Sequence, residues 1–419
     1  MMRNVTRCAI PPFSPRRTTM LVNNLRERYS PMYFLAALGA GGLAVSFFIY
    51  PMFLLPHPDT PMVTFNHLWP ALTAGGNALN SALIGIDLAT IILFAVLHFW
   101  LLAWNLREFK LFRQTDAYKK LLTSNAEINL MAVPLTLAMT INVAFVLGAV
   151  FVPNLWSVVE WMYPGAIAAF LAVGIYALRI LGAYFTRLFV HAQFDFAENN
   201  SLAPMVSIFA LAMVAVGLAA PGAMSHHREI NAIAMVLSIF FASTAILLLL
   251  IKIVLGFDAI LRHGIQPQAA GSLWIVIPIL TLLGITWIRW SMGLSHQFGN
   301  ANHPTDLLLF TTVVVSLQVI FGLIGYAVMK KVNYFADYAG GAKSNAGAFA
   351  LICPGVAFFV FGMFFISFGL VIPKLVGAGS WMYYLLMAPL IAVQLKTIQV
   401  YFRLFGKILL KPRLQLASA

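Results

Sequence analysis

The sequence predicts an all-α integral membrane protein with ten transmembrane helices, and three observations support this fold class. Hydrophobic residues make up 61% of the chain and charged residues only 9%, whereas about 25% of the residues in a typical soluble domain are charged. Ten apolar segments are each long enough to span a bilayer, which takes about 20 residues. Lysine and arginine are concentrated between alternate segments, as orientation in a membrane requires.

The apolar segments follow one another along nearly the whole chain of 419 residues, so we expect one membrane domain with short tails. The segments are 31–55, 79–104, 128–152, 157–188, 202–223, 231–254, 272–294, 306–329, 347–372 and 380–402. The first is too long for the core of a signal peptide, which has about 7–15 residues. We expect a basic, disordered cytoplasmic tail over 1–30, a ten-helix membrane domain over 31–405 and a basic cytoplasmic tail over 406–419.

The distribution of positive charge predicts the orientation. If the N-terminus is inside, 23 of the 26 lysines and arginines lie on the inner side, and only Arg228, Arg289 and Lys374 lie on the outer side. Positive residues are retained in cytoplasmic loops. The chain is therefore expected to be a multi-pass protein of a bacterial inner membrane with both termini in the cytoplasm. Because the charges serve orientation, a nucleic-acid partner is not expected.

Prolines recur on the odd-numbered segments. Pro134, Pro204, Pro278 and Pro354 are separated by 70, 74 and 76 residues. A proline inside a membrane helix frees a carbonyl and bends the axis. The spacing predicts five helical hairpins, each with a kinked first helix, arranged around a central path. Proline is also common in membrane helices in general, which is the plainer interpretation.

Ionisable residues at membrane depth are predicted only on the even-numbered segments. They are Asp87, His98, Arg179 and Lys396. Charge inside a membrane usually marks a functional pathway. If the odd-numbered helices line the central path, as the hairpin pattern predicts, that path is nearly uncharged.

The first segment reads Pro31-Met-Tyr-Phe-Leu-Ala-Ala-Leu-Gly39-Ala-Gly41-Gly42-Leu-Ala-Val. Its small residues permit either close helix packing or a pore lining. This start, and the later run Ile352-Cys353-Pro354-Gly355-Val356 followed by Ala-Phe-Phe-Val-Phe, resemble the tellurite-resistance/dicarboxylate transporter (TehA-like) family, which includes the plant slow anion channels. The resemblance implies a homotrimer, a pore formed by the odd-numbered helices and passive anion passage, with a phenylalanine gate near the middle of helix 9.

The resemblance also points to a departure at the gate. The family's gate phenylalanine precedes the helix 9 proline, and this chain has Cys353 there, before Pro354. The departure is typical of a divergent branch such as the TsoY-type proteins. Phe358 and Phe359 are the candidates for a shifted plug, or else they face lipid. The other interpretation of Cys353 is an inert buried thiol.

Other polar residues allow more than one interpretation. Arg179 and Arg187 share a helix face with His191, so they could form an anion vestibule at the inner mouth or extend to the lipid headgroups. Asp87 could be a proton or cation site or could be satisfied within its hairpin. We find no pair of histidines at facing depths that would bind haem, and none of the common hydrolase or nucleotide motifs.

These observations favour a passive channel or facilitator for small inorganic or carboxylate anions, without enzymatic activity, cofactor or metal. An uncharged path offers no deep binding well, and conduction requires weak binding. The alternative is a quinone-linked membrane anchor subunit of a redox enzyme that uses Cys353 or a bound cofactor. A transferase that uses Asp87 and His98 is a third interpretation. The ion itself cannot be named from the sequence.

Overall fold

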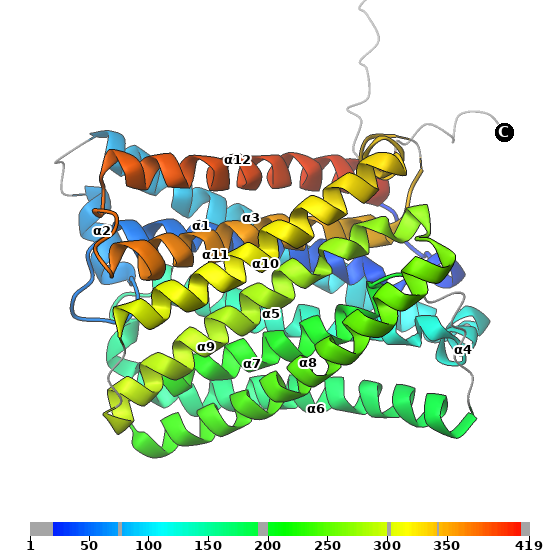
Figure 1. Ribbon diagram of the computed structural model, residues 1–419, viewed down its shortest axis with the longest axis horizontal. Coiled ribbons are helices and arrows are strands. Elements are labelled where there is room, and N and C mark those ends of the chain that lie inside the picture. Colours follow the sequence, from blue (N-terminus) through cyan, green and yellow to red (C-terminus); the bar gives the residue numbers. More distant parts are fainter. Residues whose placement is uncertain (1–19, 74–77, 192–199, 300–302, 342, 412–419) are drawn as a thin grey trace, which may run out of the picture.

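The computed structural model describes residues 20–73, 78–191, 200–299, 303–341 and 343–411, and within these ranges it contains ten helices long and apolar enough to cross a membrane. Figure 1 shows them running side by side along the long axis of the molecule. The all-α membrane fold predicted from the sequence is therefore confirmed. The two ends of the described chain meet at one end of the bundle, which we call the termini end. The opposite end is the distal end.

Five spans run from the termini end to the distal end, and each consists of a 3-10 turn followed by an α-helix. They are η2 (Pro31–Tyr33) with α1 (Phe34–Leu54), η3 (Asn125–Met131) with α5 (Ala132–Phe151), η5 (Ala203–Met205) with α7 (Val206–Met224), η6 (Pro267–Ile275) with α9 (Val276–Phe298), and η8 (Ala346–Leu351) with α11 (Ile352–Phe364) and the π-helix η9 (Phe365–Val371).

Five spans return to the termini end. They are α3 (Ala78–Phe112), α6 (Val159–His191), α8 (Arg228–His263), α10 (Pro304–Lys331) and α12 (Trp381–Leu404). Shorter elements precede, connect or follow the spans: η1 (Arg26–Arg28), α2 (Phe65–Thr73), α4 (Asp116–Leu122), η4 (Leu155–Val158), η7 (Phe335–Gly340) and η10 (Phe405–Leu409).

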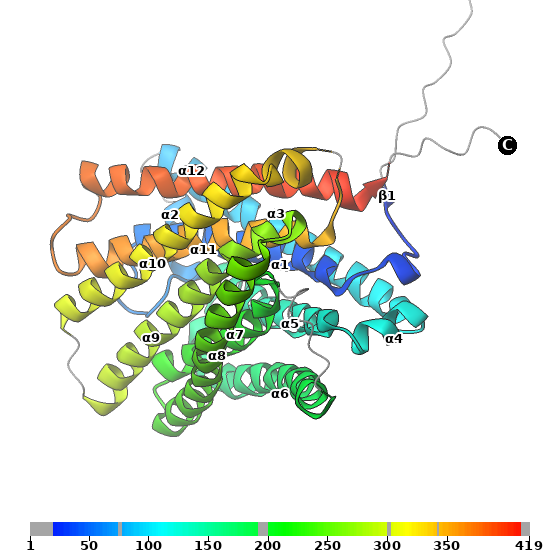
Figure 2. The same ribbon diagram turned by 45° about the vertical axis from the view of Figure 1, so that its right-hand side comes forward.

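When the ten spans are counted in chain order, the odd-numbered spans, which contain α1, α5, α7, α9 and α11, form an inner ring. In their most apolar stretches 61–83% of the residues are buried, against 22–33% in the even-numbered spans. Helices α1, α5, α7, α9 and α11 contact one another in that order, and α11 closes the ring on α1. Each even-numbered span packs on the odd-numbered span that precedes it, and Figure 2 shows the outer helices α6, α8 and α12 around this ring. The expected five hairpins with the odd helices innermost are confirmed.

The repeated prolines begin the inner helices instead of bending their middles. Pro134, Pro278 and Pro354 are each the third residue of an α-helix that follows a 3-10 turn, and Pro204 lies within η5. In the first turn of a helix the missing N–H would have no partner in any case. The expected kinks are therefore corrected to 3-10-to-α junctions at the termini end. Prolines also occur inside two outer helices, at Pro164 and Pro389.

The glycines of α1 serve both packing and lining. A Cβ at Gly41 would lie 2.7 Å from the Nδ1 atom of His98 and from the Cγ of Met139, so only glycine lets α3 and α5 approach here. Gly39 and Gly42 contact α11 and also line the central cavity described below. Gly41 therefore serves close packing, whereas Gly39 and Gly42 lie both at the contact with α11 and in the lining of the cavity.

The residues just before the first span are part of the fold. The Glu108 carboxylate accepts hydrogen bonds from the backbone N–H groups of Asn24 and Leu25, at 3.0 and 2.8 Å. Tyr29 is buried and donates to Asn105, and strand β1 (Met20–Leu21) pairs with β2 (Leu410–Lys411). The tails expected over 1–30 and 406–419 are therefore shorter, since 20–30 and 406–411 are docked on the bundle. Residues 1–19 and 412–419 lie outside the described residues.

Candidate functional site

A cavity of about 530 Å³ lies inside the ring of inner helices. It receives side chains from all five inner spans and from α6. Its lining includes Leu38, Phe48 and Ile49 of α1, Asn142 and Phe145 of α5, Phe209 and Met213 of α7, Thr281, Leu282 and Arg289 of α9, and Cys353 and Phe364 of α11. The lining reaches the exposed residues Pro61 and His226 at the distal end. The cavity is therefore a vestibule that extends from the distal surface into the bundle.

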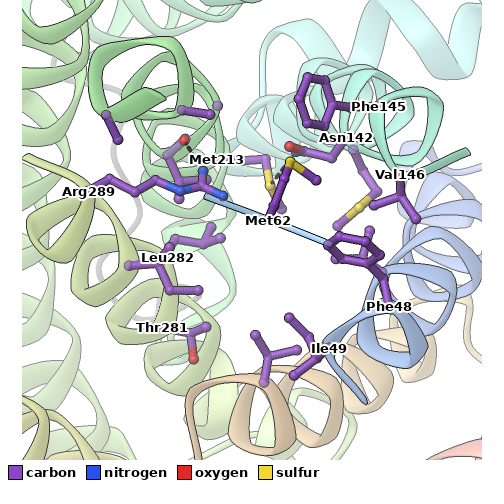
Figure 3. Close-up of a pocket in the computed structure, with 18 of the residues that line it drawn as sticks. Phe48, Ile49, Met62, Asn142, Phe145, Val146, Met213, Thr281, Leu282 and Arg289 are labelled. Carbon is purple, nitrogen blue, oxygen red and sulfur yellow. Dashed lines mark hydrogen bonds between the residues drawn. The ribbon is translucent and has the colours of Figure 1, made fainter. Parts of the chain in front are cut away.

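Arg289 brings a positive charge into this apolar cavity. It lies nine residues before the distal end of α9, or roughly 14 Å at 1.5 Å per residue. Its Nη1 donates a hydrogen bond of 2.7 Å to the Val216 carbonyl oxygen of α7. Figure 3 shows its guanidinium reaching into the space between α9 and the facing residues Phe48 and Ile49. Among the described residues no carboxylate forms an ion pair with Arg289.

Arg289 is one of the three positive charges predicted for the outer side, and it lies in the distal half of α9, within the lining of the cavity. The inner ring therefore carries a charge, whereas the sequence predicts that the odd-numbered helices are nearly uncharged. The signal was present in the sequence, because an arginine inside an apolar span is expensive and usually functional. Its position near the end of the predicted segment 272–294 concealed its depth.

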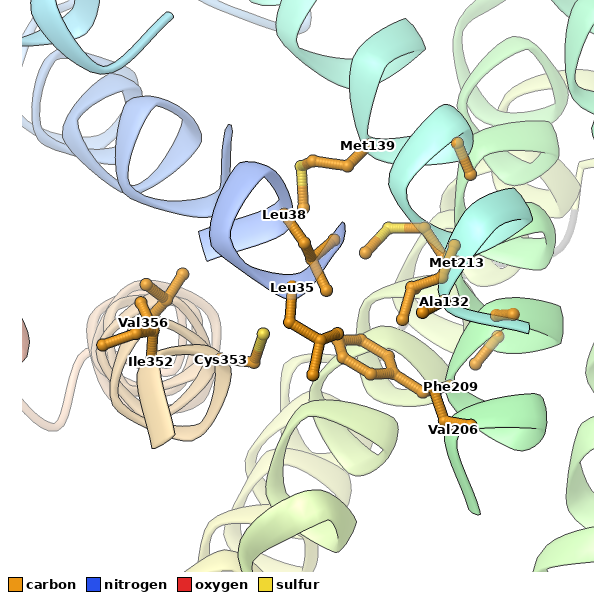
Figure 4. Packing of buried hydrophobic residues seen from close by; sticks show 14 of the residues in the cluster. Leu35, Leu38, Ala132, Met139, Val206, Phe209, Met213, Ile352, Cys353 and Val356 are labelled. Atoms are coloured by element: carbon orange, nitrogen blue, oxygen red, sulfur yellow. The ribbon is translucent and has the colours of Figure 1, made fainter. Parts of the chain in front are cut away.

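At the termini end the cavity closes on an apolar plug. Leu35, Leu38 and Phe209 are buried there, with 4%, 1% and 5% of their surfaces exposed. Figure 4 shows the Phe209 ring lying against Leu35, with the Cys353 side chain facing the same space from α11. Phe209 comes from α7, so the aromatic ring at the narrow end comes from the third inner helix. Sequence reasoning missed Phe209 because the resemblance directed attention to helix 9.

The residues predicted for the pore or gate fall in different places. Cys353 and Pro278 line the cavity, whereas Pro134, Pro204 and Pro354 do not. Phe358 and Phe359 also lie outside the lining, and Phe359 is buried against Tyr50 with ring centroids 5.1 Å apart. Phe358 and Phe359, the predicted candidates for a shifted plug, thus lie away from the cavity, whereas Phe209 lines it. Cys353 is the second residue of α11, near the termini end of its span and not in its middle.

Arg179 and Arg187, predicted for an anion vestibule at the inner mouth or for contact with lipid headgroups, do not line the cavity. Arg187 forms a mostly buried ion pair with Glu127 at 2.9 Å and donates a second hydrogen bond to the Ser124 carbonyl oxygen at 2.8 Å. It therefore fastens α6 to η3. Arg179 is exposed on the outside of α6, as expected for a side chain that extends to lipid headgroups. The side chain of His191 lies outside the described residues.

Polar side chains surround the distal mouth. The Glu160 carboxylate accepts hydrogen bonds from Ser225 Oγ at 2.7 Å and from the backbone N–H of His226 at 2.8 Å, and its Oε1 lies 2.9 Å from His226 Nδ1. The His226 and His296 rings meet edge to face at 5.2 Å. The Glu160 carboxylate is thus engaged by its neighbours, and the imidazoles of His226 and His296 lie in the lining of the mouth.

The remaining polar candidates lie apart from the cavity. Both ring nitrogens of His98 are engaged, with the Ala37 carbonyl oxygen at 2.8 Å and Thr140 Oγ1 at 2.9 Å. His98 is therefore a packing residue between inner helices and is not free to bind haem. Asp87 lies 11 residues earlier on α3, roughly 16 Å along the axis, so the two do not form one catalytic site. Neither lines the cavity.

The chain was compared with known proteins. A scan against protein-family models found no match, and a search of curated proteins found none either. The ten apolar helices and the cavity that the inner ring encloses are those of a multi-pass membrane protein of the transporter or channel kind.

Proposed function

We propose that this protein is a passive channel or facilitator for small anions. The observation that carries the proposal is Arg289, a cation that lines the cavity and has no ion-pair partner among the described carboxylates. A partly buried positive charge attracts an anion and repels a cation more strongly than an exposed one does, because its surroundings screen less well than water. A single guanidinium in a mostly apolar lining also lets the ion leave, as conduction requires.

In this proposal the plug of Leu35, Leu38 and Phe209 is the closed gate. An apolar constriction blocks ions because they would have to lose their water without replacement. Movement of the Phe209 ring would connect the vestibule to the termini end. The gate therefore lies on α7 and at the termini end, near Cys353 but not formed by a phenylalanine of α11.

The setting of the channel is also part of the proposal. We propose that the chain belongs with the tellurite-resistance/dicarboxylate transporter family, on the short runs that begin at Pro31 and Ile352, and that it forms a homotrimer in a bacterial inner membrane. Both termini would be cytoplasmic, because the positive charges gather at the termini end. The distal mouth would then face the periplasm.

The test is anion flux into proteoliposomes with variants of Arg289. Arg289→Gln is expected to lower chloride and nitrate flux at least tenfold, and Arg289→Lys to retain part of it. The matched control is Arg228→Gln, because Arg228 is an exposed cation at the same end that does not line the cavity and stacks on Phe298. Unchanged flux in well-folded Arg289→Gln protein would overturn the proposal.

A further inference from the structure

The volume of the cavity is larger than the volume that a monatomic anion occupies. A single water requires about 10–15 Å³ of such volume, and the cavity offers about 530 Å³. Sites for organic ligands typically measure about 300–1,000 Å³. A chloride ion would leave most of this space to water against an apolar wall.

The lining is apolar and deformable over most of its surface. Six methionines contribute to it: Met52, Met62, Met139, Met213, Met224 and Met292. Methionine side chains are flexible and polarisable, and they adapt to irregular apolar shapes. Together with Leu38, Val356 and Val360, they form a surface that an apolar body would cover better than water does.

Few polar groups line the cavity: those of Thr281 and Asn142 are engaged, whereas the Tyr163 hydroxyl near the distal mouth has no hydrogen-bond partner among the described residues. The Thr281 hydroxyl lies 3.1 and 3.0 Å from the carbonyl oxygens of Ile277 and Ala357 and accepts from Gln318 Nε2 at 2.7 Å. The Asn142 amide nitrogen donates to the Ala138 carbonyl oxygen. Arg289 has one hydrogen bond, to Val216, out of the five N–H groups that a guanidinium carries. The strongest free donor in the cavity is therefore Arg289.

The charge of the lining fixes the charge of the ligand. Arg289 is the one lysine or arginine among the described residues that line the cavity. A second negative charge on the ligand would remain buried without a partner, which is costly in a poorly screening environment. A monocarboxylate matches the site because its two oxygens can accept a forked hydrogen bond from the guanidinium.

We propose that the cavity binds a monovalent organic anion with an apolar body. Its carboxylate would bind Arg289, and its apolar part would lie against the methionines and aliphatic side chains of the lining. This inference rests on the proposed function and narrows its substrate class. It identifies the vestibule as a binding site for an aromatic or branched aliphatic monocarboxylate.

The experiment is equilibrium binding of radiolabelled benzoate to the full chain in lipid nanodiscs, with unlabelled competitors. We expect saturable binding that benzoate displaces at least tenfold better than benzamide, its neutral analogue, phthalate, its dianionic analogue, or chloride. Arg289→Gln should weaken binding at least tenfold, and Arg228→Gln should leave it unchanged. Equal displacement by benzamide or by chloride would overturn the proposal, because the charge or the apolar body would then contribute nothing.

A second pair of variants tests the apolar wall. Leu282→Phe fills the cavity about two helical turns from Arg289 on α9, whereas the next residue along α9, Leu283, does not line it. We expect Leu282→Phe to lower benzoate affinity at least tenfold and Leu283→Phe to retain it, both in protein that elutes as the parent does in size-exclusion chromatography. Equal affinity of the two variants would contradict the proposed site. Chloride flux without benzoate binding would contradict this inference but not the channel proposal. Benzoate binding without flux of any anion would contradict the channel proposal but not this inference.

Discussion

Arg289 carries a full positive charge into a ring of helices that is otherwise apolar. Arg289 is partly buried, and taking a charge out of water is costly when no opposite charge is present; its hydrogen bond to the Val216 carbonyl oxygen offsets part of this cost. Such residues persist in membrane helices mostly where they serve a pathway. An anion in the cavity would supply the missing partner, so the residue that is hardest to explain by stability is the one that binding explains.

Cys353 gives a prediction at the same scale, because it lies in the cavity lining close to the plug. The chain's other cysteine, Cys8, is first replaced by serine so that only Cys353 can react. A small thiol reagent added from the distal side is then expected to label Cys353 slowly and to lower anion flux. Cys353→Phe is expected to lower flux as well, by narrowing the floor of the cavity. Mass spectrometry of the labelled protein and flux into liposomes check both outcomes. Complete protection of the thiol, with normal flux through Cys353→Phe, would show that it does not face the path.

At the scale of elements, each inner helix begins with a 3-10 turn and a proline and ends at the distal end. A hydrogen bond or ion pair joins three of these turns, η2, η3 and η6, to outer helices. The turn η3 shows this, because Glu127 pairs with Arg187 of α6 and the two side chains are only 8% and 12% exposed. The pair therefore fixes the position of α6 along its axis relative to the inner ring. Its charges neutralise each other and do not serve an anion path.

The Arg187 pair predicts a loss of stability without a loss of selectivity. Arg187→Met leaves Glu127 buried without its partner, which should lower the free energy of unfolding by about 3 kcal/mol. Arg179→Met, on the exposed face of the same helix, should change it by no more than ~0.5 kcal/mol. Thermal denaturation in detergent compares the two variants. Reduced anion flux per folded molecule in Arg187→Met would show instead that Arg187 belongs to an anion vestibule at the inner mouth.

The elements were predictable, but their facing side chains were not. Apolar length and the 23 charges of the inner side predicted ten helices, and the scarcity of charge on alternate spans predicted which five lie inside. The inner helices are apolar on every side, so they carry no helical periodicity that separates pore face from packing face. Phe209 and Leu38 look the same in the sequence as their buried neighbours. The partner of Arg187 lies 60 residues away in the chain, which spacing along one helix cannot reveal.

At the scale of the whole molecule, the closed ring of five hairpins gives the vestibule one wide opening at the distal end and one apolar stop at the termini end. Positive charge is concentrated toward the termini end, where 23 of the 26 lysines and arginines are expected. This asymmetry predicts the orientation. Reporter fusions after residues 65 and 300 should be external, and fusions after residues 115 and 415 internal. An internal signal at residue 300 would reverse the assignment of the mouth to the periplasm.

The central claim is that the vestibule conducts anions once the plug is removed, and the most direct measurement is the reversal potential of Phe209→Ala in a planar bilayer under a potassium chloride gradient. The control is Phe241→Ala, since Phe241 is equally buried but packs against Gly174 and does not line the cavity. We predict that Phe209→Ala carries more current than the parent or Phe241→Ala, with a reversal potential close to that of chloride. A reversal potential close to that of potassium, or no current above that of Phe241→Ala, would contradict the account.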